Sequence, residues 1–146
     1  MILISACLTG VPCRYNGSCF NLPKLLSLVE KGEAVQVCPE TAGGLPTPRN
    51  CIEIGENQKA LESTGIDRSE EIEKGIMQIL KIYPANTISA AILKDKSPSC
   101  GSSFIYDGNF TGTLISGEGL FVETLRKLGI PIYNEINHMR LIEDAF

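Results

Sequence analysis

The stretch TISAAILK, residues 87 to 94, is an apolar run that ends abruptly in charge. The run from Thr87 to Leu93 is too short for a buried helix, and its β-branched and apolar side chains favour a strand buried on both faces. The segment that follows, KSPSCGSS at residues 96 to 103, contains Pro98 and Gly101, which favour a loop. The run therefore predicts a central strand that places Cys100 just beyond its carboxyl end.

Helical patterns flank this strand on both sides. Ser69 is positioned to cap a helix whose apolar stripe consists of Ile72, Ile76, Met77 and Leu80. Downstream, residues 118–128 repeat a helical stripe that Gly129 ends, and residues 130–133 form a further strand candidate. The chain thus alternates between strands and helices around residues 87–93.

The N-terminal part repeats the same alternation. Residues 2–6 and 34–37 are short apolar strand candidates, and the leucines between them keep helical spacing up to Gly32. We expect no regular structure in ETAGGLPTPRN, residues 40–50, because of its glycines and prolines. The polar stretch 53–67 is expected to be a surface excursion, and residues 137–145 a terminal helix.

Alternating strands and helices predict one α/β domain over residues 1–146, with a mostly parallel sheet between two helical layers in a Rossmann-like arrangement. Ligands of such sheets bind in the crevice beyond the carboxyl ends of the strands. Cys7, Cys38 and Cys100 each follow one of the predicted strands. We therefore expect the three cysteine loops to meet at one site.

Composition limits the function. Apolar residues make up 43% of the chain, charged residues 21%, and the net charge is −4. The acidic balance argues against binding a nucleic-acid backbone, and no run is long enough to span a membrane. The opening MILISACL does not read as a signal peptide, so a cytoplasmic location is expected. Because His138 is the one histidine, a histidine base or a histidine-rich metal site is disfavoured.

The chain has six cysteines, at positions 7, 13, 19, 38, 51 and 100. A disulfide framework is not required, because a domain of this size can fold on its core and the cytoplasm keeps thiols reduced. Zinc is disfavoured because no C-x-x-C pair occurs. A phosphate-binding thiol would need arginine six residues after Cys7, where Cys13 stands and Arg14 comes one residue late.

Three readings of the cysteines remain open on spacing alone. They could be small buried hydrophobes, or Cys7 and Cys13 beside Arg14 could form a peroxide-sensing thiol pair. Alternatively, Cys7, Cys38 and Cys100 could bind an iron–sulfur cluster. Three ligands would leave one iron open, which suits catalysis on a sulfur-bearing substrate better than electron transfer.

Four motifs narrow this choice. They are SACLTGVPCRYNG (5–17), VCPETAGGLPTPR (37–49), KSPSCGSS with IYDG (96–103 and 105–108) and GIPIYNE (129–135). In this order they resemble the thiouracil desulfidase family over residues 2–135. The resemblance implies a 4Fe-4S cluster bound by Cys7, Cys38 and Cys100, and removal of sulfur from a thiolated pyrimidine without net redox change.

The implied site includes further residues. Glu40, two residues after Cys38, is expected to act as a general base on water, while the substrate sulfur binds the open iron. Ser97 is expected to hold the ring or relay a proton. The expected substrate contacts are Ser99, Ser102, Ser103 and Arg14, with Arg49 and Lys96 as further candidate cations.

These inferences predict a sulfur-removing hydrolytic enzyme acting on a small molecule such as thiouracil. The alternative is a noncatalytic iron–sulfur or thiol-based redox-sensing module. The chain departs from the family pattern at Asn16, where relatives often have aspartate, and at Asn50 and Cys51 after PTPR. These departures bear on the pocket wall and on the choice of substrate.

Overall fold

Four parallel strands form the central sheet of the computed structural model, which describes the backbone of residues 1–145 and the side chains of residues 1–142. Their order across the sheet is β2, β1, β5 and β8, and each neighbouring pair is parallel. The strands are β1 (Ile2–Ser5), β2 (Ala34–Val37), β5 (Ala90–Leu93) and β8 (Ile132–Asn134). The predicted α/β fold with a mostly parallel sheet is confirmed.

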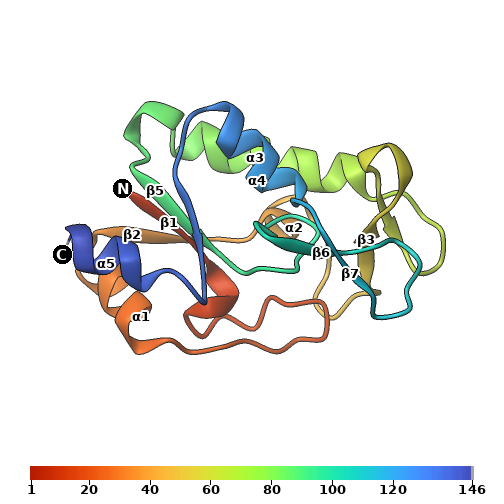
Figure 1. Cartoon of the computed structure of the whole chain (residues 1–146), viewed down its shortest axis with the longest axis horizontal. Coiled ribbons are helices and arrows are strands. Elements are labelled where there is room, and N and C mark those ends of the chain that lie inside the picture. The colour runs from red at the N-terminus through yellow and green to blue at the C-terminus, as the bar shows by residue number, and fades with distance from the viewer. Residues whose placement is uncertain (146) are drawn as a thin grey trace.

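Helices cover both faces of this sheet (Figure 1). The α-helices are α1 (Pro23–Glu30), α2 (Pro39–Ala42), α3 (Ser69–Ile82), α4 (Leu120–Lys127) and α5 (Met139–Ala145). Short 3₁₀ helices are η1 (Ala6–Leu8), η2 (Glu56–Gln58) and η3 (Ala85–Thr87). Among the described residues, no helix combines the length and the hydropathy needed to cross a bilayer.

Alternating side chains of the strands divide the core into two layers. Leu3 packs in a cluster with the buried side chains of α3 and α4, whereas Ile2 and Ile4 pack with those of α1. Since successive side chains of a strand point to opposite faces, β1 joins both layers and is buried along its whole length. This places a fully buried strand directly before Cys7.

Parallel register aligns the carboxyl ends of the strands. Ser5 of β1 pairs with Val37 of β2, and Ile4 pairs with Ile92 of β5. The loops that follow these strands therefore leave the sheet at the same edge. The structure thus confirms that the three cysteine loops share one edge.

Two antiparallel hairpins complete the molecule at this edge. The first pairs β3 (Ile52–Ile54) with β4 (Ala60–Glu62), and the second pairs β6 (Phe104–Tyr106) with β7 (Leu114–Ser116). The prediction that 53–67 is a surface excursion was wrong, because Glu53 and Glu62 are buried. Both acids have hydrogen-bond partners, which allow their carboxyl groups to be buried. This polar segment therefore forms a buried pair of strands.

Other local predictions also need correction. Residues 39–42 form one helical turn, where Pro39 at the first position suits the helical backbone. Met77 was assigned to the core but is 68% exposed, while Ile72 and Ile76 are buried as predicted. Ser69 begins α3 rather than capping it. Its hydroxyl accepts a hydrogen bond from the backbone of Ala60 instead.

Candidate active site

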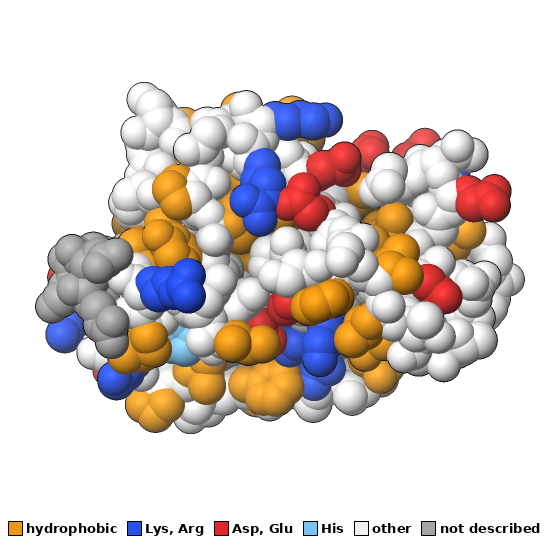
Figure 2. Space-filling view, in the orientation of Figure 1, with side chains coloured by type: hydrophobic (Ala, Val, Ile, Leu, Met, Phe, Trp, Pro, Cys, Tyr) orange, Lys and Arg blue, Asp and Glu red, His pale blue; other side chains and the backbone are white. Residues whose placement is uncertain are grey.

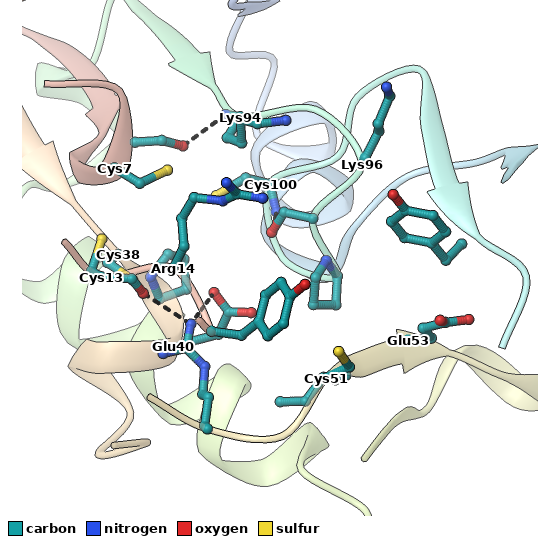
Figure 3. A pocket seen from close by; sticks show the side chains of 18 of the residues that line it. Cys7, Cys13, Arg14, Cys38, Glu40, Cys51, Glu53, Lys94, Lys96 and Cys100 are labelled. Atoms are coloured by element: carbon teal, nitrogen blue, oxygen red, sulfur yellow. Dashed lines mark hydrogen bonds and ion pairs between the residues drawn. The ribbon is translucent and has the colours of Figure 1, made fainter. Parts of the chain in front are cut away.

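A cavity of about 620 Å³ opens where the carboxyl ends of β1, β2 and β5 meet the two hairpins. Its lining includes four cysteines, Cys7, Cys13, Cys38 and Cys100, together with Glu40. Figure 3 shows these side chains arranged around one space, although they come from three separate segments that follow β1, β2 and β5. The predicted convergence of Cys7, Cys38 and Cys100 at one cavity is what the structure shows.

Each of these three cysteines is positioned by the element before it. Cys7 lies in η1 directly after β1 and is 7% exposed. Cys38 has an extended backbone and precedes the first turn of α2. Cys100 is 5% exposed, and the glycine after it leaves room for a tight loop: a Cβ on Gly101 would lie 2.8 Å from the carbonyl oxygens of Ser97 and Phe104.

Cys13 supplies a fourth thiol to the same wall. Its thiol interacts with those of Cys38 and Cys7. The interaction with Cys38 lowers the pKa of Cys13, but the interaction with Cys7 and burial outweigh it and raise that pKa to about 11. Cys13 is thus as much a part of the thiol cluster as the three predicted ligands.

Two of the predicted ligands, Cys38 and Cys100, also have raised pKa values. The hydrogen bond from Cys13, followed by burial, raises the pKa of Cys38 far above its ordinary value. Burial raises the pKa of Cys100 to about 12, despite a hydrogen bond with Ser5 that lowers it. A set of thiolate ligands at this place requires a strong positive charge, which a bound metal centre supplies.

Glu40 lies on α2 and is 9% exposed. Burial raises the pKa of its carboxyl group, against the opposing effects of Arg49 and of a Ser99 hydrogen bond. The Arg49 guanidinium lies 3.3 Å from Glu40 Oε2, and its side chain is 6% exposed. Glu40 therefore reaches the cavity as one half of a buried ion pair.

Arg49 connects Glu40 to two loops. Its Nη1 donates to the Pro46 carbonyl and to the Thr47 hydroxyl, and its Nη2 donates to the Cys13 carbonyl at 3.1 Å. Because the terminal nitrogens are engaged in several directions, the guanidinium is held in one orientation. Arg49 thereby links the base candidate to the segment that carries Cys13.

The cysteine loop is ordered by its serines. Ser97 lines the cavity, and its hydroxyl accepts hydrogen bonds from the backbone of Ser99 and Cys100. Ser99 is fully buried, and its hydroxyl donates to Cys100 Sγ at 3.6 Å. Ser97 combines a turn role with a place on the cavity wall, whereas Ser99 lies behind that wall.

Asp95 holds the other end of this loop. Its Oδ1 accepts hydrogen bonds from the backbone N–H groups of Lys96, Ser102, Ser103 and Phe104. Burial would raise its pKa, but these bonds outweigh that effect and lower it. Ser102 and Ser103 were expected to contact the substrate, but neither lines the cavity. Their backbone N–H groups bind Asp95 instead.

Cationic side chains surround the opening. Arg14 lies over the Phe20 ring at 5.0 Å from its centroid, and Lys94 Nζ lies 5.7 Å from the same centroid. Lys94 also pairs with Glu135 at 2.7 Å, and Lys96 lines the cavity nearby. Figure 2 shows basic and apolar side chains next to one another in the middle of this face. Arg14 thus lines the cavity, where it is expected to contact the substrate.

The donor set fits an iron–sulfur cluster. Soft thiols that reach one cavity from separate loops are the ligands that such clusters take. All six cysteines are free, and within the described residues no three potential donor side chains are close enough to share one metal ion. An iron–sulfur cluster does not require this, because each of its thiolate ligands binds a different iron. Cys19 is exposed and lies outside the cavity, whereas Cys51 is exposed but lies on its wall.

Several residues of the site were not foreseen. Asp95, Phe20 and Glu53 line the cavity, and Glu135 receives a hydrogen bond from the Asp95 backbone. Asp95 could have been found, because an acid between a strand and a cysteine loop is placed to bind the loop's N–H groups. Nothing in the sequence indicated that Glu53 lines the cavity, because its strand borders a polar stretch that is typical of a surface loop.

A three-layer α/β fold with a thiol-lined cavity at its carboxyl edge is suited to a protein that carries out chemistry with a thiolate-bound cofactor. Residues 2–137 match the profile of the family described as 2-thiouracil desulfurase, and the chain belongs to this family.

Known relatives agree with this assignment. The chain is similar to a solved structure of the 4Fe-4S-dependent thiouracil desulfidase TudS, with a TM-score of 0.91 and 39% identity over 98% of this chain and 95% of that one. It is also 41% identical over 144 residues to the uncharacterized protein YbbK of Bacillus subtilis (strain 168), covering 92% of this chain and 95% of that protein.

Proposed function

We propose that this protein is an iron–sulfur-dependent desulfidase that converts a thiolated pyrimidine such as thiouracil into its oxygen counterpart. The reaction exchanges a C=S bond for a C=O bond: water supplies the oxygen, and the sulfur leaves as sulfide. The oxidation state of the carbon does not change, so no electron donor is needed. The observation that carries the proposal is the convergence of Cys7, Cys38 and Cys100 with Glu40 in one cavity.

Cys7, Cys38 and Cys100 would hold a 4Fe-4S cluster. When bound, such a cluster with one open iron supplies a Lewis acid that attracts sulfur and polarises a thiocarbonyl bond. The nearby cations Arg14 and Lys96 would offset the negative charge of a thiolate-bound cluster. Cys13 is left as a thiol in contact with two of the ligands.

Glu40 would accept a proton from the attacking water. Its support is geometric: the carboxylate lines the cavity, and the Arg49 guanidinium fixes its orientation through the buried ion pair. A base that is held in one place by a buried partner loses little entropy when the water arrives. The same proton can then be returned to the departing sulfide.

Ser97 would position the substrate or relay a proton, since its hydroxyl lies on the cavity wall beside the cysteine loop. Ser99, Ser102 and Ser103 would act indirectly, by keeping that loop in shape. We also propose a cytoplasmic location, where the six free cysteines would stay reduced.

The test is an assay on anaerobically purified or reconstituted protein. Iron and sulfide content are measured first, and 2-thiouracil and 4-thiouracil are then supplied while uracil and sulfide are quantified. We expect about four irons and four sulfides per chain, as in a 4Fe-4S cluster, together with stoichiometric release of uracil and sulfide. A protein that binds iron and sulfide but releases no uracil would overturn the enzyme proposal in favour of an iron–sulfur sensor.

A further inference from the structure

The segment from Arg49 to Glu53 lines the cavity along its whole length. Asn50 also donates to Glu62, and Ile52 also packs in the core. Glu53 lies in the middle of β3, and Figure 3 shows its side chain at the cavity. Glu53 is therefore an acidic residue of the cavity wall.

A tight turn fixes the Glu53 carboxylate. Its Oε1 accepts hydrogen bonds from the backbone N–H of Gly108 at 3.0 Å and of Phe110 at 3.2 Å. Gly108 packs so closely on β3 that an added Cβ would lie 2.9 Å from Gly55 Cα and from the Ile54 carbonyl oxygen. Because the turn and the strand are in direct contact, the carboxylate has little freedom to move.

The second oxygen of Glu53 is left for a ligand. Glu53 is 9% exposed and takes part in no ion pair among the described residues, unlike Glu40 and Glu62. Oε2 accepts none of the hydrogen bonds found within the described residues. Since Arg49 Nε is the one buried side-chain nitrogen or oxygen there without a partner, Oε2 is accessible. An accessible oxygen of a cavity-lining residue can meet what enters the cavity.

The surroundings of Glu53 suit a flat heterocycle. Tyr106 and Phe110 come from the second hairpin and line the same cavity. Figure 3 shows Glu53 on the opposite side of the cavity from Cys7, Cys13 and Cys38, with Glu40 between them. A ring placed with its sulfur toward the thiols would thus have another edge facing Glu53, and aromatic side chains offer stacking surfaces for its faces.

We propose that Glu53 recognises the substrate by accepting a hydrogen bond from a ring N–H of the pyrimidine. A carboxylate can only accept hydrogen bonds, and the N–H groups are the donors on a uracil-type ring. An N-methylated ring would leave the carboxylate at the cavity wall without a hydrogen-bond donor, and the ring would therefore bind much more weakly. Glu53 is thus a specificity-determining residue, an inference that rests on the function proposed above.

The test compares the wild type with Glu53→Gln. Glutamine keeps a carbonyl oxygen for the Gly108 and Phe110 N–H groups but replaces the accessible oxygen with an NH₂ donor. KM and kcat are measured for 2-thiouracil and for its 1-methyl and 3-methyl derivatives, and uracil binding is followed by calorimetry.

For the wild type we expect one of the two methyl derivatives to have a KM about 100-fold higher than 2-thiouracil. In Glu53→Gln we expect uracil and 2-thiouracil to bind about tenfold more weakly, with kcat changed less than KM, and the discrimination against that derivative to fall to about tenfold or less. Unchanged uracil affinity and unchanged discrimination in a folded Glu53→Gln protein would overturn the inference.

Glu62→Gln is the matched control. It makes the same change in a buried acid of the same hairpin, but Glu62 bonds with Arg68 and Asn50 and does not line the cavity. It should keep the full discrimination. If Glu53→Gln does not fold, the wild type decides alone: equal use of both methyl derivatives overturns the inference. A wild type that does not turn over thiouracil overturns the proposed function instead.

Discussion

The cavity has two halves that are built in different ways. The thiol half lies at the carboxyl edge of the parallel sheet, where Cys7, Cys38 and Cys100 follow β1, β2 and β5. The hairpin half is made of β3 and the turn after β6, which contribute Glu53 and Phe110. The thiol half is suited to hold a cofactor, and the hairpin half is suited to recognise a ring.

We infer that the thiol half determines the chemistry and that the hairpin half determines the substrate specificity. The two central strands, β1 and β5, are buried on both faces, so ligands placed directly after them are preorganised. The hairpins pack on this edge but do not extend the sheet. We therefore expect changes in the thiol half to abolish activity, and changes in the hairpin half to alter which substrate is used.

The largest effect should come from the predicted ligands. Cys7→Ser, Cys38→Ser and Cys100→Ser should each lose the brown colour and the desulfidase activity, because a serine hydroxyl is a poor ligand for iron in such clusters. Absorption spectra and iron content measured under anaerobic conditions give the result. Cys19→Ser should keep both, since Cys19 lies outside the cavity. Equal losses in all four variants would refute the ligand assignment.

Glu40→Gln should separate catalysis from cofactor binding within the thiol half. We expect the iron content to stay at the wild-type level and kcat to fall at least about 100-fold, because the amide cannot accept the proton of water. Steady-state kinetics with 2-thiouracil, next to the absorption spectrum, provide the measurement. Wild-type kcat in this variant would remove Glu40 from the mechanism.

The two halves also differ in the burial of their ion pairs. Arg49→Met should lower the free energy of unfolding by about 3 kcal/mol, because it leaves Glu40 buried without its cation. Arg68→Met should cost much less, since Arg68 is 31% exposed and Glu62 keeps its hydrogen bond from Asn50. Urea unfolding of both variants tests the difference. Similar losses would mean that the thiol half is not the more tightly buried one.

Asp95→Asn should have a smaller, pH-dependent effect. The pKa of Asp95 is lowered in the folded state, so its ionised form stabilises the fold above the unfolded pKa of about 4. This contribution is lost as the pH falls through the folded pKa. At pH 7 the variant should be about 1 kcal/mol less stable, and the gap should close below about pH 4. A gap that stays constant with pH would show that charge at Asp95 is unimportant.

The sequence was sufficient for the thiol half because simple rules apply there. An apolar run such as residues 87–93 identifies a buried strand, and parallel topology then puts the cysteines after each strand at one edge. The motifs supplied the identity of the family. Met77 was misplaced because helical periodicity alone does not say where the buried stripe ends.

The buried acids of the first hairpin could not be predicted from the sequence in the same way. Glu53 and Glu62 interrupt the hydropathy pattern of their strands, and their burial depends on N–H, amide and guanidinium groups from elsewhere in the chain. Such partners are brought together by the fold and leave no local signal in the sequence. For the same reason Ser102 and Ser103 were taken for substrate contacts, whereas their backbones bind Asp95.

The most direct test of the central claim is a crystal structure of the anaerobically reconstituted protein, with iron located by its anomalous scattering. We expect the iron signal inside the cavity, bonded to the Sγ atoms of Cys7, Cys38 and Cys100, with one iron free of protein ligands. Iron bound outside this cavity, or a cluster in which Cys13 replaces one of the three ligands or occupies the fourth iron, would contradict it.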